Sequence, residues 1–190
     1  MAVVPLEKTG KGKIYNYKDY EKLPEGSPYQ LIGGELVMTP SPVPYHQIIS
    51  MRIEYELLKF VEERKLGIIL YAPIDVYLSE EDIYQPDIIF ISNDRLNIIG
   101  EKKIESAPDL IVEILSPATA YYDLKHKKRI YESSGVKEFW IIDPMEKSIE
   151  VYENVGGRFK LFNEVIKKGK IHSNLIKGLE VEVETVFKLA

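Results

Sequence analysis

Apolar residues recur at helical spacing in one long stretch of the chain and at strand spacing in several shorter ones. From Pro44 to near Gly67 they return every three or four positions, which predicts a long helix with one buried face. The apolar runs over residues 68–78, 86–92 and 109–115 predict strands. The last run is almost continuously apolar, which is typical of a strand in a sheet that is covered on both faces.

Turn residues and further patterns complete the predicted order of elements. Gly33 and Gly34 stand between two apolar runs and predict a tight hairpin turn, because glycine adopts the positive φ that such a turn needs. Residues 17–23 predict a short helix, and residues 121–135 predict a second main helix that ends at Gly135. Further strands are predicted over residues 137–143, 148–154 and 158–164, and residues 175–187 end in an alternating run. This order predicts an α/β fold with a mixed central β-sheet flanked by α-helices.

The composition fits one ordinary globular domain. The chain has 190 residues, of which 45% are hydrophobic and 29% are charged, enough for a sizeable core. Residues 1–13 carry charge and glycine without periodicity, so we expect a flexible N-terminal arm followed by a single domain over residues 14–190. No apolar run reaches about 18 residues, and the N-terminus lacks the apolar stretch of a signal peptide. We therefore expect no membrane segment and a cytoplasmic location.

The content of cysteine, histidine and charge narrows the chemistry. The chain has no cysteine, which excludes disulfides and thiolate metal sites. Its histidines, His46, His126 and His172, are too scattered to favour a zinc centre, so any metal ion needs oxygen ligands. A net charge of −5 argues against a protein that coats nucleic acid non-specifically, but it is compatible with a local basic groove.

Two acidic residues and one lysine are unusual in their surroundings. Glu113 lies in the middle of an apolar strand, where an ionised carboxylate is costly unless it is paired. Asp87 begins the preceding predicted strand, so both carboxylates reach the same end of the sheet if the two strands are neighbours. Lys127 falls among the apolar residues of the next helix, whereas Lys125 and Arg129 fall on the opposite side. We therefore expect Glu113 and Lys127 to share a site.

Such a group of residues suits metal-assisted hydrolysis of a phosphodiester. Two carboxylates that lie close together repel each other, and a divalent cation between them relieves both this repulsion and the cost of burial. The cation polarises the phosphate and lowers the pKa of a bound water, and the ammonium group of a lysine stabilises developing negative charge.

Longer runs of the sequence resemble a known family. The runs QPDIIFIS and APDLIVEILSPATAYYDLKHKKRIYESSGVKEFWIIDP resemble the Uma2 family of restriction-endonuclease-like proteins, a branch of the PD-(D/E)xK nuclease superfamily. The resemblance covers roughly residues 17–155. It implies a restriction-endonuclease-like core and an endonuclease that depends on Mg²⁺ or Mn²⁺ and hydrolyses phosphodiester bonds in nucleic acid, expected to be DNA. By analogy with restriction-type folds, we also expect a homodimer.

The resemblance implies the main site residues by position. Asp87 matches the aspartate of the family's PD dipeptide, Glu113 matches its second acid, and Lys127 matches the lysine of a D-x-x-x-K-x-x-x-Y helix. The implied metal ligands are Asp87, Glu113 and Ile114. The superfamily's (D/E)xK triplet reads Glu113-Ile114-Leu115 here, without the strand lysine. We expect Lys127 to replace that lysine from the helix.

Further residues carry weaker predictions. Glu35 matches an early glutamate that assists at the metal, and His46 matches a histidine at the start of the long helix. Each also has a plain structural interpretation, as a solvated hairpin residue and an ordinary helix-start residue. Asp109 repeats the Pro-Asp dipeptide and is an alternative to Asp87, while Tyr131 is most simply explained by core packing.

Two other functions stay open at this point. Glu113 and Lys127 can form a structural ion pair and nothing more, which fits a noncatalytic binding or interaction module that keeps the nuclease fold. The acidic composition and the missing strand lysine favour that alternative. A metal phosphoesterase that acts on a small molecule is the other possibility, and a closed pocket would distinguish it from a nuclease with an open groove.

Overall fold

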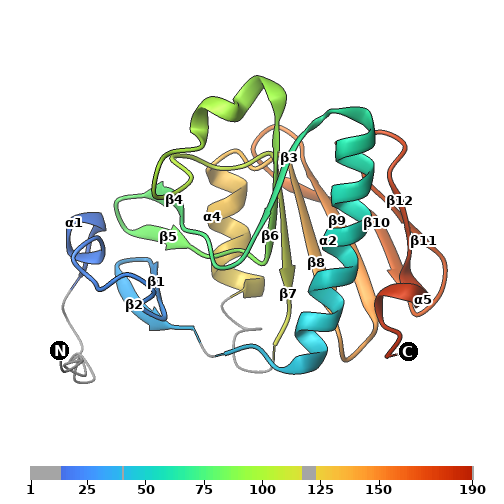
Figure 1. Cartoon of the computed structure of the whole chain (residues 1–190), viewed down its shortest axis with the longest axis horizontal. Coiled ribbons are helices and arrows are strands. Elements are labelled where there is room, and N and C mark those ends of the chain that lie inside the picture. Colours follow the sequence, from blue (N-terminus) through green and yellow to red (C-terminus); the bar gives the residue numbers. More distant parts are fainter. Residues whose placement is uncertain (1–13, 40, 117–122, 190) are drawn as a thin grey trace.

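A mixed six-stranded β-sheet forms the centre of the protein (Figure 1). The structure is a computed structural model that describes residues 14–39, 41–116 and 123–189, without the side chains of Asp123 and Leu124. Neighbouring strands run antiparallel, except that β7 and β8 are parallel. In order across the sheet the strands are β10 (Phe159–Ile166), β9 (Ser148–Asn154), β8 (Glu138–Asp143), β7 (Leu110–Ile114), β6 (Ile88–Ser92) and β3 (Gly67–Tyr71).

Helices and a smaller sheet cover the two faces of this central sheet. On one face lies α2 (Pro44–Arg64), whose buried side chains pack on the strands together with those of α5 (Val183–Val186). On the other face lie a π-helical turn, η2 (Asp123–Lys127), and its continuation α4 (Lys128–Ser133). The residues that α2 buries are Ile49, Ile53, Leu57 and Val61, at the spacing that predicts the helix. The predicted mixed sheet with flanking helices is confirmed.

A four-stranded sheet packs beside α4. Its strands, in order, are β2 (Glu35–Met38), β1 (Tyr29–Ile32), β5 (Asp82–Tyr84) and β4 (Val76–Ser79). Gly33 and Gly34 form the turn between β1 and β2 with φ of +56° and +77°, so the predicted hairpin is confirmed. The remaining elements are α1 (Tyr17–Tyr20), the 3₁₀ helix η1 (Asn93–Ile98) and the strand pair β11 (Lys170–His172) and β12 (Glu180–Glu182).

Two predicted elements differ from the structure. The apolar run over residues 68–78 is not one strand but two, because β3 joins the central sheet and β4 joins the smaller one. Pro73 lies between them, and proline lacks the N–H that a continuing ladder needs. The alternating run at the C-terminus contains two elements, because β12 is followed directly by the helix α5.

Part of the expected organisation concerns residues that the structure leaves out. The flexible arm predicted for residues 1–13 lies outside the described residues, and the single domain over residues 14–190 stays a prediction. Within the described ranges, no helix is both long and apolar enough to cross a bilayer.

A buried glutamate ties the C-terminal segment to the central sheet. Glu138 begins β8 and is 1% exposed. Its Oε1 accepts hydrogen bonds from Trp140 Nε1 at 2.7 Å and Ser173 Oγ at 2.6 Å. Its Oε2 accepts the backbone N–H groups of Asn174 and Leu175, each at 2.7 Å. These donors offset the cost of burying the carboxylate.

Replacing Glu138 by glutamine should destabilise the fold. The amide group would direct its own donors at groups that need an acceptor, so buried N–H or O–H groups would lose their partners. We expect the free energy of unfolding to fall by about 2–4 kcal/mol, measured by urea denaturation. Glu146→Gln, at an exposed position, is the matched control and should be nearly neutral. Equal effects of the two substitutions would contradict this account.

Candidate active site

Asp87 and Glu113 lie at the same end of the central sheet. β6 and β7 pair antiparallel with Ile88 opposite Val112, so the same register puts Asp87 opposite Glu113. The backbone N–H of Ile114 donates a hydrogen bond of 2.7 Å to Asp87 Oδ2. This bond fixes the aspartate to the strand that carries the glutamate.

The partner of Glu113 comes from the helix that follows it. Glu113 is 3% exposed and Lys127 is 4% exposed. Glu113 Oε1 accepts hydrogen bonds from Lys127 Nζ at 2.9 Å and from the hydroxyl of Tyr131 at 2.6 Å. Charge-assisted bonds of this kind offset the loss of solvation that both charges suffer on burial.

The start of the helix directs Lys127 inward. The π-helical turn η2 ends at Lys127, and α4 begins at the next residue. Lys127 and Tyr131 are four residues apart on one buried face, whereas Lys125 and Arg129 are exposed. Lys127 is therefore on the side of the helix that the apolar pattern predicts. Single π-helical turns occur frequently at functional sites.

His46 approaches Asp87 from the other face of the sheet. It lies in the first turn of α2, and its Nε2 is 3.4 Å from Asp87 Oδ2. Its Nδ1 is buried and has no hydrogen-bond partner within the described part of the chain. Burial opposes the charged imidazolium, but the Asp87 carboxylate, the Ile114 carbonyl and the charge of Glu113 together raise the pKa of His46 above its usual value. The carboxylate of Asp87 therefore favours the protonated form of the His46 ring.

A second layer of side chains surrounds the Glu113 ion pair. The ring of Tyr84 packs edge-on against Tyr131 with centroids 5.6 Å apart, and Lys127 Nζ is 5.8 Å from the centre of the Tyr84 ring. The Tyr84 hydroxyl donates to Asp82 Oδ1 at 2.6 Å, and the same oxygen accepts the backbone N–H of Gly33 at 3.0 Å. Burial, together with the Asp82 carboxylate, raises the pKa of Tyr84 well above its usual value. The hairpin between β1 and β2 is thereby connected to the site.

Asp109, the alternative to Asp87, lies at the other end of β7. Its side chain is fully buried, and its Oδ1 contacts Lys137 Nζ at 2.7 Å and Arg95 Nη1 at 3.1 Å. Its Oδ2 accepts the N–H and the hydroxyl of Ser92 at 2.8 and 2.9 Å. Burial opposes ionisation of Asp109, but these partners lower the pKa of its carboxyl group below the usual value. The contacts of Asp109 are those of a structural residue.

The structure connects most of the predicted site residues through these contacts. Asp87 is bonded to Ile114 and lies beside His46, while Glu113 is paired with Lys127. Glu35 is different: it begins β2 and is exposed. No hydrogen bond or ion pair in the described part of the chain joins Glu35 to the other predicted site residues, so its role stays a prediction.

Comparisons with known proteins identify the family of the chain. A sequence model of the Uma2 family, described as "Putative restriction endonuclease", matches residues 17–184. The chain belongs to the Uma2 family. It is similar to "Uncharacterized protein sll1609" of Synechocystis sp., with 23% identity over 139 residues that cover 72% of this chain and 78% of that relative.

A solved structure has the same fold as this Uma2 protein. It is the crystal structure of "a putative nuclease belonging to DUF820" from Anabaena variabilis, with a TM-score of 0.75 and 21% identity. The match covers 90% of this chain and 97% of that chain. The predicted family and the predicted restriction-endonuclease-like fold class are confirmed.

Sequence reasoning missed two parts of the site in this Uma2 protein. Tyr131 does pack in the core, but it also donates a hydrogen bond to Glu113. Its place four residues after Lys127 is the signal that could have shown this. The pair formed by Asp82 and Tyr84 has a weaker signal, since both residues alternate onto one face of a strand of only three residues.

The Glu113–Lys127 pair should show strong energetic coupling. Glu113→Gln or Lys127→Met alone leaves one buried charge without its partner, and each should lower the free energy of unfolding by about 3–5 kcal/mol. The double variant should lose much less than the sum, as measured by denaturant unfolding. The exposed Lys170–Glu180 pair, at 3.0 Å, is the matched control and should show little coupling. Additive losses at Glu113 and Lys127 would contradict the pairing.

Asp109→Asn should destabilise the protein at neutral pH and less so in acid. The folded pKa of Asp109 is lowered, and an aspartate in the unfolded chain titrates at about 3.9. The stabilisation by the ionised group is therefore complete above that unfolded value and is lost as the pH falls through the folded pKa. Urea unfolding of both proteins from neutral to acidic pH measures the difference. If the difference in the free energy of unfolding between the two proteins grows as the pH falls, the ionised form of Asp109 is not the stabilising one.

Proposed function

We propose that this Uma2 protein is a metal-dependent endonuclease that hydrolyses phosphodiester bonds in DNA. The proposal rests on the side chains at one end of the central sheet. There Asp87 accepts a hydrogen bond from the backbone of Ile114, next to Glu113, and Lys127 is buried against Glu113. Acidic groups beside a cation suit the hydrolysis of an anionic ester. The description of the Uma2 family as "Putative restriction endonuclease" and of the similar DUF820 protein as "a putative nuclease" supports the same reaction.

The available donor atoms suit a hard divalent cation. The carboxylates of Asp87 and Glu113 and the main-chain carbonyl of Ile114 offer only oxygen, which Mg²⁺ and Mn²⁺ prefer. Within residues 14–39, 41–116 and 123–189, no three acidic or histidine side chains cluster into a closed metal cage. Mg²⁺ that is bound through one or two carboxylates keeps waters and substrate phosphate among its ligands. When bound, that ion would neutralise phosphate charge and lower the pKa of an attacking water.

The residues of the chain have distinct roles in this proposal. Lys127 holds Glu113 in place and supplies the positive charge that the strand lacks at Leu115. Tyr131 fixes the orientation of the same carboxylate through its hydroxyl group. His46 orients Asp87 and, with a pKa raised above its usual value, is suited to take up or deliver a proton.

Other parts of the proposal extend beyond these contacts. Glu35 is proposed to assist at the metal on the strength of its position after the GG turn. A homodimer is proposed because restriction-type folds act in pairs on two-fold symmetric duplex DNA. A cytoplasmic location is proposed because an enzyme of this kind would meet cellular DNA there.

A noncatalytic nuclease-fold module is the second candidate. Two observations favour it: the ammonium of Lys127 already neutralises Glu113, and the chain has a net charge of −5. Under this alternative the ion pair serves the fold alone. Calorimetric titration with Mn²⁺ separates the candidates, since only the nuclease needs ion binding that Asp87→Asn abolishes.

The purified protein should cleave plasmid DNA with Mg²⁺ or Mn²⁺ and not with EDTA. Asp87→Asn and Glu113→Gln should each lower the cleavage rate by about 100-fold or more, because each removes negative charge that holds the cation. Lys127→Met should have an effect of similar size. Gel analysis of supercoiled, nicked and linear DNA gives the rates, and circular dichroism shows whether each variant folds.

Asp94→Asn is the matched control, because Asp94 is exposed on η1 and should keep the rate of the unmodified protein. Folded Asp87→Asn protein that cleaves as fast as the unmodified protein would refute the assignment. A well-folded chain that neither binds Mn²⁺ nor cleaves would establish the noncatalytic module instead.

A further inference from the structure

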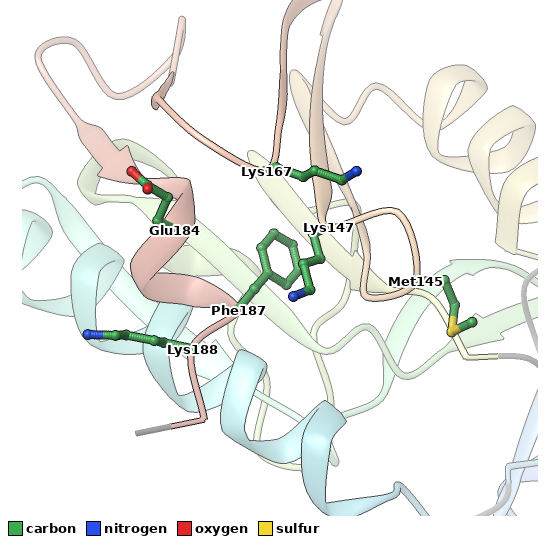
Figure 2. A pocket seen from close by; sticks show the side chains of 6 residues that line it. All are labelled: Met145, Lys147, Lys167, Glu184, Phe187 and Lys188. Carbon is green, nitrogen blue, oxygen red and sulfur yellow. The ribbon is translucent and has the colours of Figure 1, made fainter.

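A groove of lysines lies beside the proposed active site, and we name it the lysine groove. Its first part is a pocket of about 380 Å³, and its second part is a pocket of about 370 Å³ that continues from Lys188 along α2. The first pocket is lined by Met145, Lys147, Lys167, Glu184, Phe187 and Lys188 (Figure 2). The second is lined by Met51, Arg52, Tyr55, Glu56, Thr185 and Lys188.

The turn between β8 and β9 brings one side of the groove to the active end of the sheet. This turn carries Met145 and Lys147. β8 runs parallel to β7, and the backbone N–H of Leu115 donates to the carbonyl of Ile142 at 2.8 Å. The end of β7, which carries Glu113, therefore lies directly beside the strand that leads into the turn.

The first turn of α2 brings the other side of the groove to the same place. The hydroxyl of Tyr45 donates to the carbonyl oxygen of Phe187 at 3.0 Å. Tyr45 immediately precedes His46, whose ring contacts Asp87. The first turn of α2, which carries His46, is therefore joined to the segment of Phe187 that lines the first pocket.

Positive charge dominates the first pocket. Across the described ranges, Lys147, Lys167 and Lys188 form no ion pair with an acidic side chain. Glu184 also lines the pocket, but it contacts Lys168 at 3.9 Å. In Figure 2, Lys147 lies next to the Phe187 ring, with Lys167 and Lys188 on either side. This concentration of positive charge contrasts with the net charge of −5 for the chain.

Two of these lysines occupy strained backbone positions. Lys147 and Lys167 have φ of +54° and +62°, a region that glycine adopts more readily. The backbone N–H of Lys167 donates to the carbonyl of Lys147 at 2.8 Å, which holds the two turns together. This bond keeps the backbones of the two lysines next to each other.

Exposed apolar side chains lie in both pockets beside the cations. Met145, Tyr55 and Met51 are 82%, 60% and 58% exposed. A tyrosine ring stacks on any nucleobase, and the flexible side chain of methionine adapts to varied apolar partners. Phosphate-binding cations interleaved with stacking surfaces are typical of sites that hold a single nucleic-acid strand.

We propose that the lysine groove binds one nucleic-acid strand where it leaves the active site. Its phosphates lie against Lys147, Lys167 and Lys188, and an unpaired base stacks on Tyr55. This inference rests on the proposed nuclease function, because the groove gains its meaning from the reaction at Asp87. Interleaved stacking surfaces favour nucleic acid over an anionic lipid surface, which would contact the lysines alone.

Charge reversal in the groove tests this inference by binding. The probe is a fluorescein-labelled single-stranded DNA of about 15 nucleotides, followed by fluorescence anisotropy in EDTA so that cleavage cannot occur. The triple variant K147E/K167E/K188E should raise Kd about tenfold or more. It should also reduce the slope of log K against log salt by about two, since each single-strand phosphate contact contributes about 0.7.

The aromatic part of the groove has its own variants. Tyr55→Ala should raise Kd about fivefold or more, because a stacked base is worth at least about 1 kcal/mol. Tyr55→Phe keeps the ring and should bind like the unmodified protein. Weakening by Tyr55→Phe equal to that by Tyr55→Ala would show that stacking is not the interaction.

A matched control separates the groove from total charge. The triple variant K22E/K102E/K160E changes the net charge equally at exposed lysines outside the groove, and it should bind with Kd within about twofold of the unmodified protein. Equal weakening by both triple variants would overturn the inference. Duplex DNA of the same sequence is the second probe, and tighter duplex binding that the groove variant leaves unchanged would overturn it as well.

Two measurements distinguish a groove that does not bind nucleic acid from a protein that is not a nuclease. Cleavage by the unmodified protein is measured separately with Mg²⁺ or Mn²⁺. If the unmodified protein and the K147E/K167E/K188E variant cleave DNA with the same KM, the proposal for the groove is refuted. The proposed nuclease function then still stands. Groove-dependent binding without any cleavage would refute the nuclease and establish a strand-binding protein.

Discussion

The hydrogen bonds that Lys127 and Tyr131 donate to Glu113 are the interaction on which the architecture of the site depends. A carboxylate in a sheet covered on both faces has no water to stabilise it, so the fold must supply the donors. β7 and β8 are parallel, and parallel strands need a crossover connection, which here contains α4. The same crossover that completes the sheet therefore brings an ammonium and a phenol over the glutamate.

Three of the buried acids in the described part of the chain are stabilised in three ways. Glu113 has a lysine and a tyrosine, Asp109 has Arg95 and Lys137 with Ser92, and Glu138 has neutral donors. Burial of a carboxylate is therefore a poor guide to function in this chain. What distinguishes Glu113 is its position, because it alone of the three lies opposite Asp87 at the end of β7, with His46 close by.

The sequence alone was sufficient to predict those features whose pattern is local and extends over many residues. It predicted α2, the Gly33-Gly34 hairpin, the mixed sheet and the inward face of Lys127, because spacing and turn chemistry decide these features. It failed where short elements or long-range contacts decide. β5 has three residues, too few to show alternation, and three of the four donors to Glu138 come from residues more than thirty positions away, which no local pattern reveals.

The positive charge beside Glu113 comes from Lys127 on a helix, and this affects which residues β7 can contain. In a (D/E)xK strand, the acid and the lysine lie on the same side of one β-strand. Neither position is then available for an apolar side chain of the core. Here Leu115 takes the third position and packs with the apolar cluster beneath α4, while the charge arrives separately. The acid and its positively charged partner thus come from two different elements of the chain. A linear acid-x-lysine search passes over such a site, whereas a lysine four residues ahead of a buried tyrosine on the crossover helix marks it.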